Sequence, residues 1–123
     1  MAIPGVLDHC VTMSYSEYQP SDPEVAEWRE RVKTMFPYDS LSPFNLAGIA
    51  SALVFVEALK RAGPDLTRDK FLDAMGTIKN FDTGLLPGPL TCNPPVSHQC
   101  NRGFAWIRKV GGSIETIAMT VVE

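Results

Sequence analysis

The chain has 123 residues, a length that suits one domain or part of one. Hydrophobic residues make up 45% of it and charged residues 20%, which are ordinary globular values that argue against disorder. A net charge of −3 gives no basic surface, so nucleic acid is not an expected partner.

The distribution of apolar residues argues against two further classes. No apolar run approaches the roughly 18–20 residues that span a bilayer, because the stretch from Leu46 to Leu59 is interrupted by Gly48, Ser51 and Glu57. The N-terminal MAIPGVLDHC lacks a basic region followed by a long apolar one, so no signal peptide is expected. As written, the chain is expected to remain in the cytoplasm.

The first predicted elements are a short strand and a helix. Val6–Thr12 is rich in branched and apolar residues, which favour a strand, and residues 15–20 are expected to form a loop. Asp22 is a suitable N-cap and Pro23 fits the first helical position, while Pro37 ends the helix. The apolar residues of this helix recur at spacings of three and four, which makes one apolar stripe: Val25, Trp28, Val32 and Met35.

A second helix is predicted from about Phe44 to Ala62. Its apolar residues cover most of the helix circumference until Glu57, which is typical of a helix that is buried on more than one side. Small residues such as Gly48 and Ala52 would let another helix or a sheet approach closely.

The most informative stretch runs from Val56 to Thr91, with the sequence VEALKRAGPDLTRDKFLDAMGTIKNFDTGLLPGPLT. Gly63 is a stop signal for the second helix. Thr67 is a good N-cap for a third helix over Arg68–Met75, and Gly76 is expected to end that helix. The stretch therefore predicts two helices with a well-marked turn between them.

The remainder of the chain changes character at Asp82. Residues 82–91 (DTGLLPGPLT) are too rich in Gly and Pro for a helix and predict an extended connector. Gly103–Val110 and Ser113–Val122 alternate in part, and Gly111–Gly112 between them is a strong signal for a two-residue hairpin turn. One strand and one hairpin supply little sheet for three apolar helices. Self-contained packing and an absent parallel sheet both fit this order.

Taken together, the helix end, glycine stop, capped helix and Gly/Pro-rich connector of Val56–Thr91 resemble a known family. They are similar to the C-terminal part of the periplasmic solute-binding proteins of branched-chain amino-acid ABC transporters, which have the type I periplasmic-binding fold. The likeness is good over Asp22–Thr91 and looser at both ends. It implies an α/β fragment, with the helices of one lobe followed by a crossover and a terminal β-hairpin.

In that family, two lobes are joined by three crossovers, and solute binds in the cleft between the lobes. The resemblance implies a single partial domain with three segments. Residues 1–20 would hold a strand and the second crossover, and residues 21–81 would be a three-helix segment that returns to the first lobe. Residues 82–123 would form the third crossover and the hairpin that completes the second lobe.

The resemblance also implies a role in amino-acid transport. The intact relative would lie in the periplasm, bind a small organic solute such as an amino acid or an aromatic acid, and deliver it to the membrane permease of an ABC importer. No enzymatic activity and no cofactor are expected. Because much of each cleft wall is absent, the chain by itself is expected to bind solute poorly.

A protein of a different class also fits the sequence. An independent α+β interaction module could complete its core by forming a homo-oligomer or by binding a partner chain. The apolar second helix and the terminal hairpin, whose edges are free to pair with other strands, motivate this alternative.

Two tyrosines are the candidate ligand-binding residues. Tyr15 and Tyr18 lie beside the second crossover that the resemblance implies, near the cleft of the family. Aromatic rings with a polar tip suit small-molecule pockets. Two ordinary loop tyrosines are the simpler interpretation.

The cysteines raise the questions of a disulfide and of a metal site. Three cysteines leave one thiol over if two of them pair. Cys92 and Cys100 flank the loop CNPPVSHQC, and a disulfide between them is expected in an oxidising compartment. Zinc takes Cys and His ligands, but the C-x5-H-x-C spacing is not a standard one, so no metal is expected. The residues weighed as ligands are His9, Cys10, Cys92, His98 and Cys100.

Catalysis has little support in the sequence. His9 beside Cys10 suggests a thiolate–imidazole pair, but neighbours on a strand point to opposite faces. Asp65, Asp69 and Asp73 are more typical of a solvated helix face than of an acid–base site. No catalytic residue is therefore expected.

Overall fold

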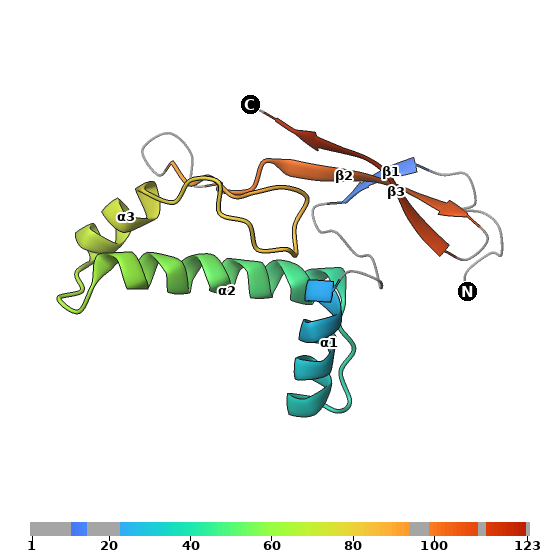
Figure 1. Cartoon of the computed structure of the whole chain (residues 1–123), viewed down its shortest axis with the longest axis horizontal. Helices are drawn as coiled ribbons and strands as arrows, with labels where there is room; N and C mark the ends of the chain where they lie inside the picture. Colours follow the sequence, from blue (N-terminus) through green and yellow to red (C-terminus); the bar gives the residue numbers. More distant parts are fainter. Residues whose placement is uncertain (1–10, 15–22, 94–98, 111–112, 123) are drawn as a thin grey trace.

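The computed structural model describes residues 11–14, 23–93, 99–110 and 113–122. Within these ranges the chain forms three helices and three strands, in the order expected from the sequence. The helices lie together, the strands form a separate sheet, and the long segment between α3 and β2 runs along α2 before it reaches the sheet (Figure 1). The elements are β1 (Val11–Ser14), α1 (Pro23–Met35), α2 (Pro43–Ala62), α3 (Arg68–Gly76), β2 (Gly103–Val110) and β3 (Ser113–Val121).

Helix α2 is capped at both ends by its own sequence. The Ser42 hydroxyl accepts a hydrogen bond from the Asn45 backbone N–H at 3.3 Å, and the Ser42 N–H donates to Asn45 Oδ1 at 2.8 Å. This capping box satisfies N–H groups that the first helical turn leaves unpaired. At the other end Gly63 adopts φ 78°, and its N–H donates to Leu59 O. Gly63 therefore ends the helix, as predicted.

Helix α3 begins as predicted but ends differently. The Thr67 hydroxyl accepts from the Lys70 N–H at 3.2 Å, which confirms the predicted N-cap. The prediction that Gly76 ends the helix is wrong, because Gly76 lies inside α3 and Thr77 is the C-cap in a right-handed conformation. The Thr77 hydroxyl donates to Ala74 O at 2.7 Å, so a side chain takes the place of a left-handed glycine.

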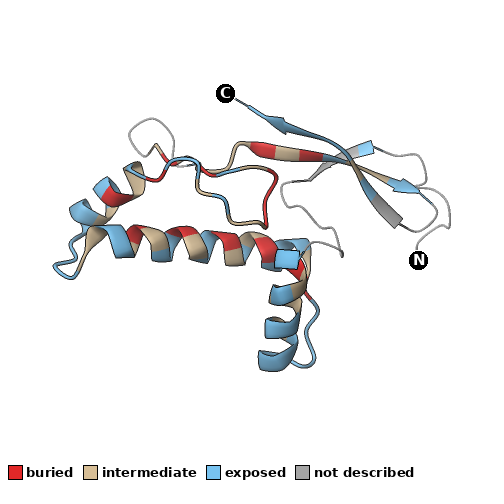
Figure 2. Cartoon of the chain, viewed as in Figure 1, coloured by how far each residue is buried: buried red, intermediate tan, exposed pale blue. Residues whose placement is uncertain are grey.

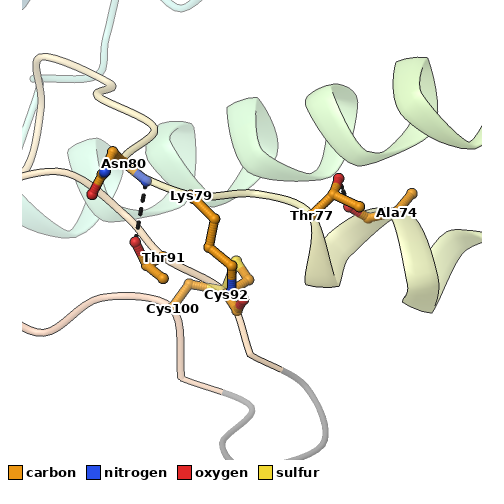
Figure 3. Close-up of a disulfide and its surroundings, with 7 residues drawn as sticks. All are labelled: Ala74, Thr77, Lys79, Asn80, Thr91, Cys92 and Cys100. Carbon is orange, nitrogen blue, oxygen red and sulfur yellow. Dashed lines mark hydrogen bonds between the residues drawn. A yellow bond between two sulfur atoms is a disulfide. The ribbon is translucent and has the colours of Figure 1, made fainter.

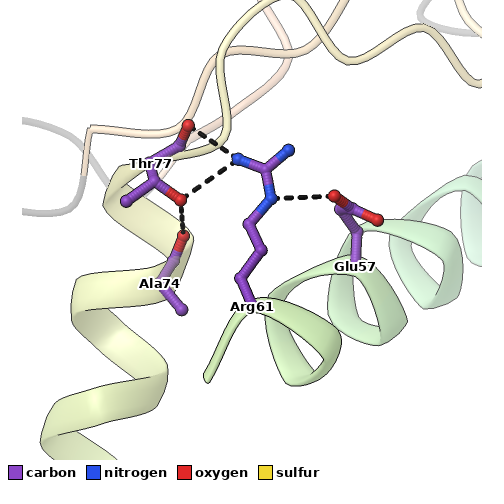
Figure 4. A network of polar contacts seen from close by, with 4 residues as sticks. All are labelled: Glu57, Arg61, Ala74 and Thr77. Atoms are coloured by element: carbon purple, nitrogen blue, oxygen red, sulfur yellow. Dashed lines mark hydrogen bonds and ion pairs between the residues drawn. The ribbon is translucent and has the colours of Figure 1, made fainter. Parts of the chain in front are cut away.

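One arginine joins the ends of α2 and α3. Arg61 Nη1 donates to Thr77 O at 2.7 Å and lies 3.1 Å from Thr77 Oγ1, while Arg61 Nε donates to Glu57 Oε1 at 2.8 Å (Figure 4). The Arg61 guanidinium thus donates to the backbone carbonyl of Thr77 at the end of α3. The Glu57 carboxylate, one turn earlier on α2, holds the guanidinium in place. This contact fixes the angle at which the two helices meet.

The core lies between α2 and the segment that follows α3. Leu46 and Ala50 on α2 are fully buried, and so are Ile78 and Leu85 on the segment that crosses them. Val25 anchors α1 on the same core. The remaining buried members of the cluster come from the same places: Leu41, Val54, Ala58, Leu86, Leu90 and Cys92.

The other side of α2 is uncovered, contrary to the expectation of burial on more than one side. Phe44, Phe55 and Val56 are 88%, 53% and 45% exposed. Figure 2 shows buried residues recurring along α2 with exposed ones between them. The periodicity identified an apolar helix, but only one of its two apolar faces has a partner within the described residues.

Helix α2 also departs from the expectation that no segment is long and apolar enough for a membrane. By length and composition Pro43–Ala62 meets that requirement, because its few polar residues do not outweigh its apolar ones. Core helices of soluble proteins meet it too. Here one side of the helix forms the core of the helical part.

The predicted extended connector is instead a closed loop. The Phe81 N–H donates to Leu90 O at 2.9 Å, and the Leu90 N–H donates to Phe81 O at 2.8 Å, so the two ends of the loop pair as an antiparallel bridge. Gly84 and Gly88 adopt φ 66° and φ 94°, conformations that let the chain reverse. The Gly and Pro content excluded a helix correctly, but the turns bring Leu85 and Leu86 back onto α2.

The strands form one antiparallel sheet in the order β1-β2-β3. Strand β3 pairs with β2 as the predicted hairpin, with Val110 opposite Ser113, and β1 adds to the other edge of β2. The turn residues Gly111–Gly112 lie outside the described residues. Strand β1 extends to Ser14, past the predicted end at Thr12, and the part of that prediction before Val11 is also outside them.

Among the described side chains of β2, only those at the end where the chain enters the sheet are buried. Gly103 and Ala105 are buried, whereas the later residues of β2 are partly or largely exposed. Trp106, which fits a core position in the sequence, is 38% exposed, and its indole N–H donates to Thr120 Oγ1. Trp106 is exposed because no described element covers this face of the sheet.

We predict that substitutions on the two faces of α2 change the stability of this chain by very different amounts. Leu46→Ala removes a fully buried side chain and is expected to lower the free energy of unfolding by about 2–5 kcal/mol. Phe44→Ala removes an 88% exposed side chain and is expected to change it by less than about 0.5 kcal/mol. Urea unfolding followed by circular dichroism measures both, and equal losses would contradict this assignment of the core.

Candidate functional site

The candidate site is the joint between the helical part and the sheet, where a disulfide closes the chain on itself. Cys92 and Cys100 are bonded with S–S 2.08 Å and Cα atoms 4.3 Å apart, as the sequence predicted (Figure 3). Cys92 is almost fully buried in the core. The disulfide therefore ties the end of the crossover, residues 82–91, to the residues that lead into β2.

Hydrogen bonds on both sides of the disulfide reinforce this joint. Lys79 Nζ donates to Cys92 O at 2.8 Å, and the Cys92 N–H donates to Ile78 O at 3.0 Å. The Asn80 N–H donates to Thr91 Oγ1 at 3.1 Å, as drawn in Figure 3. Thr91 in turn donates its N–H to Cys100 O. Residues 78–80, residues 91–92 and Cys100 are thus held together as one unit.

A cavity of about 330 Å³ lies on one side of the joint. Lys79 and Arg102 bring two positive charges to its wall. Val121, the last residue of β3, and Val122, which follows it, also line the cavity. The Val122 N–H donates to Arg102 O at 2.9 Å, which sets the position of that wall. The other lining residues are Asn80, Pro89, Thr91, Asn93 and Cys100.

An apolar cavity of about 380 Å³ lies on the other side, between α2, α3 and the crossover. Its aromatic wall is formed by Phe55 and Phe71, whose ring centroids are 5.1 Å apart at 52°. The disulfide contributes Cys100 to the rim. The lining also includes Ser51, Val54, Met75, Leu86, Leu90, Gln99 and Asn101. Such a wall suits an aliphatic or aromatic group.

The candidate residues from the sequence have different outcomes. The tyrosines Tyr15 and Tyr18 lie outside the described residues, as do His9, Cys10 and His98, so the ligand-binding role of the tyrosines stays a prediction. Asp65, Asp69 and Asp73 are exposed on α3 and on the loop before it. Over the described ranges no three His, Cys, Asp or Glu side chains gather where they could hold a metal ion.

The cavity-lining residues were not singled out from the sequence. Lys79, Asn80 and Arg102 lie in segments separated by the crossover, and each looks like an ordinary loop residue. Only the pairing of Phe81 with Leu90 and the disulfide bring them together. The glycines of the crossover were the one available signal, because they marked a segment with unusual turns.

Comparison with known proteins assigns the chain to a family. A family model described as "Periplasmic binding protein" matches residues 2–112. The chain belongs to the periplasmic binding protein family. The matched residues include α1, α2, α3 and the joint, so the resemblance seen in the sequence is confirmed. A search of curated proteins finds no significant match.

Two solved structures share the fold of this family member. The leucine-binding protein LivK from Thermotoga maritima matches with a TM-score of 0.64 and 18% identity, over 94% of this chain and 32% of that one. A protein assigned as a branched-chain amino acid ABC transporter from Rhodospirillum rubrum matches with a TM-score of 0.72 and 18% identity, over 93% and 32%. The chain therefore spans about a third of the length of either structure, and has the fold of that part.

We predict that the disulfide stabilises the joint measurably. Cys100→Ser opens a loop with a sequence separation of 8 and is expected to lower the free energy of unfolding by about 2–3 kcal/mol. Cys10→Ser removes the remaining cysteine and is the matched control. Urea unfolding of both variants under non-reducing conditions tests this, and equal midpoints would show that the disulfide contributes nothing.

A second prediction concerns the close approach of the crossover to β2. A Cβ on Gly103 would lie 1.5 Å from Pro87 O and 2.7 Å from Pro87 C, so backbone would have to move. Gly103→Ala is expected to destabilise the chain by roughly 1–3 kcal/mol. The control Gly48→Ala meets no atom within 4 Å and is expected to stabilise α2 by about 0.5–1 kcal/mol. Thermal unfolding should move in opposite directions for the two variants.

Proposed function

We propose that this chain is part of a solute-binding protein of an ABC importer for branched-chain amino acids or similar small organic solutes. The observation that carries the proposal is the match to the periplasmic binding protein model over residues 2–112. The two structural neighbours support it, because their names refer to leucine binding and to branched-chain amino acid transport. On this basis the intact protein binds solute outside the inner membrane and passes it to a membrane permease.

We further propose that the chain alone binds solute poorly. The structural matches span 93–94% of this chain but only 32% of each neighbour. Most of the surface that encloses a solute in a complete protein therefore lies outside this chain. Small-molecule sites bury most of the ligand surface. The two cavities at the joint flank a single connection between parts, and neither is enclosed by a second lobe.

The joint is suited to the relative motion of two lobes. The described contacts between elements are extensive within the sheet and between α2 and α3, while the crossover carries the connection from helices to sheet. Hinges are a few loop residues between rigid units. We propose that residues 21–81 belong to one lobe, that residues 82–123 are the crossover and the end of the other lobe, and that residues 1–20 hold a strand and a further crossover.

The compartment and the binding residues follow from the same proposal. A disulfide persists in an oxidising compartment such as the periplasm, and Cys92–Cys100 fits an intact protein that works there. Tyr15 and Tyr18 remain the candidate ligand-binding residues, next to β1. No catalytic step is assigned to the chain.

A second candidate function is an interaction module that completes itself with another chain. The edge strand β3 and the uncovered side of α2 favour it, because both offer unsatisfied surface. Sedimentation of the chain over a range of concentrations distinguishes the two. A stable dimer with both surfaces protected from hydrogen exchange would favour the module.

We predict that isothermal titration of the isolated chain with leucine, isoleucine, valine or benzoate shows no binding tighter than about 1 mM. The physical reason is the missing part of the cleft. A matched titration uses the same solutes with the chain joined to the rest of a solute-binding protein. Micromolar binding by the isolated chain would show that it is competent by itself.

A further inference from the structure

Two positive charges meet at the smaller of the two cavities at the joint. Lys79 and Arg102 both line the cavity of about 330 Å³, and none of its lining residues is acidic. The ion pairs between described residues involve Arg31, Arg61 and Arg108, so no described carboxylate lies within ion-pair distance of either cation. A chain with a net charge of −3 therefore concentrates positive charge at this cavity.

The donor groups around the cavity are held in place by the joint itself. Lys79 Nζ donates to Cys92 O at 2.8 Å, which leaves two of its three N–H groups for another acceptor. The Thr91 hydroxyl accepts from the Asn80 N–H at 3.1 Å and keeps its own proton to donate, and Figure 3 shows these side chains beside the disulfide. Arg102 is partly buried, and its guanidinium carries five N–H donors in a planar arrangement. Donors that are already positioned reduce the entropic cost of binding an anion.

Part of the cavity wall is apolar. Pro89, Val121 and Val122 line it beside the charged groups. A ligand with an anionic head and a short aliphatic body would therefore contact both kinds of surface. The cavity lies at the lower end of the range of about 300–1,000 Å³ that is typical of small-molecule pockets, which favours a small ligand.

We propose that this cavity binds a small aliphatic phosphate monoester, and that Lys79 and Arg102 bind its phosphate oxygens. A phosphate monoester carries a charge of about −1.5 to −2 at pH 7, which matches two cations better than a single carboxylate does. An arginine donates two parallel N–H groups to phosphate oxygens, and a lysine adds a compact positive charge.

This site does not depend on the proposed solute-binding function. An amino acid suits the cavity poorly, because its ammonium group would lie beside two cations and find no acidic side chain among the lining residues. A phosphate monoester has no such group. The two ligand classes are therefore distinguishable by their charge.

Titration of the whole chain with butyl phosphate, followed by NMR of the backbone amides, tests the proposal. We expect the amide signals of Thr91 and Arg102 to shift with a dissociation constant tighter than about 1 mM. Butyrate has a similar aliphatic body but a single negative charge, and is expected to bind about tenfold more weakly or less. The neutral compound 1-butanol is expected to cause no saturable shift.

A pair of variants tests the role of the charge. Arg102→Gln removes one cation from the cavity and is expected to weaken butyl phosphate binding about tenfold or more. Lys109→Gln is the matched control, because Lys109 is an exposed cation on β2 that does not line the cavity, and its affinity is expected to stay unchanged. Arg102→Lys keeps the charge and is expected to restore part of the lost affinity. Circular dichroism checks that the variants keep their fold.

Several results would overturn the proposal. These are no binding of butyl phosphate tighter than about 1 mM, equal affinities for butyl phosphate and butyrate, or equal affinities of the two Gln variants. Binding to phosphatidylglycerol vesicles without binding of butyl phosphate would also overturn it, because a membrane surface would then be the partner. Leucine is expected to leave the butyl phosphate affinity unchanged, and competition between them would show a shared amino-acid site instead. Absence of leucine binding alone counts against the proposed solute and leaves the phosphate site standing.

Discussion

The packing of the crossover on α2 is the contact on which the rest of the structure depends. Leu46 and Ala50 project from one side of α2, and Ile78 and Leu85 meet them from a segment with no regular secondary structure of its own. This contact gives the helical part its core. It also fixes where the chain leaves that core for the sheet, because the bridge between Phe81 and Leu90 closes the loop at the same place.

The disulfide and its hydrogen bonds make that exit point rigid. Cys92 is buried in the core while Cys100 precedes the sheet, so the bond joins the two parts of the molecule covalently close to the crossover. Lys79 holds the carbonyl of Cys92 from the segment after α3. The disulfide and these hydrogen bonds lie directly beside the glycine-containing loop of residues 82–91.

Uncovered apolar surface is the second main feature of the structure. A helix with two apolar faces gains stability in proportion to the area that it buries, and α2 buries one face while Phe44 and Phe55 remain exposed. Within the described residues of β2, burial is likewise confined to the first residues of the strand. The chain belongs to the periplasmic binding protein family and spans about a third of the length of either structural neighbour.

Local sequence patterns were sufficient to predict the order and most boundaries of the elements, the caps at Thr67 and Gly63, the disulfide and the family. These depend on local hydrogen bonding, backbone conformation and short loops, which neighbouring residues control. Three features could not be predicted locally: the return of residues 82–91 onto α2, the capping of α3 by Thr77 rather than Gly76, and the exposure of Trp106. The first two depend on contacts between residues far apart in the chain, Leu90 with Phe81 and Arg61 with Thr77, and the third on which described elements pack against the sheet. The cavities at the joint belong to the same class, because Lys79 and Arg102 become neighbours only when the loop between them closes.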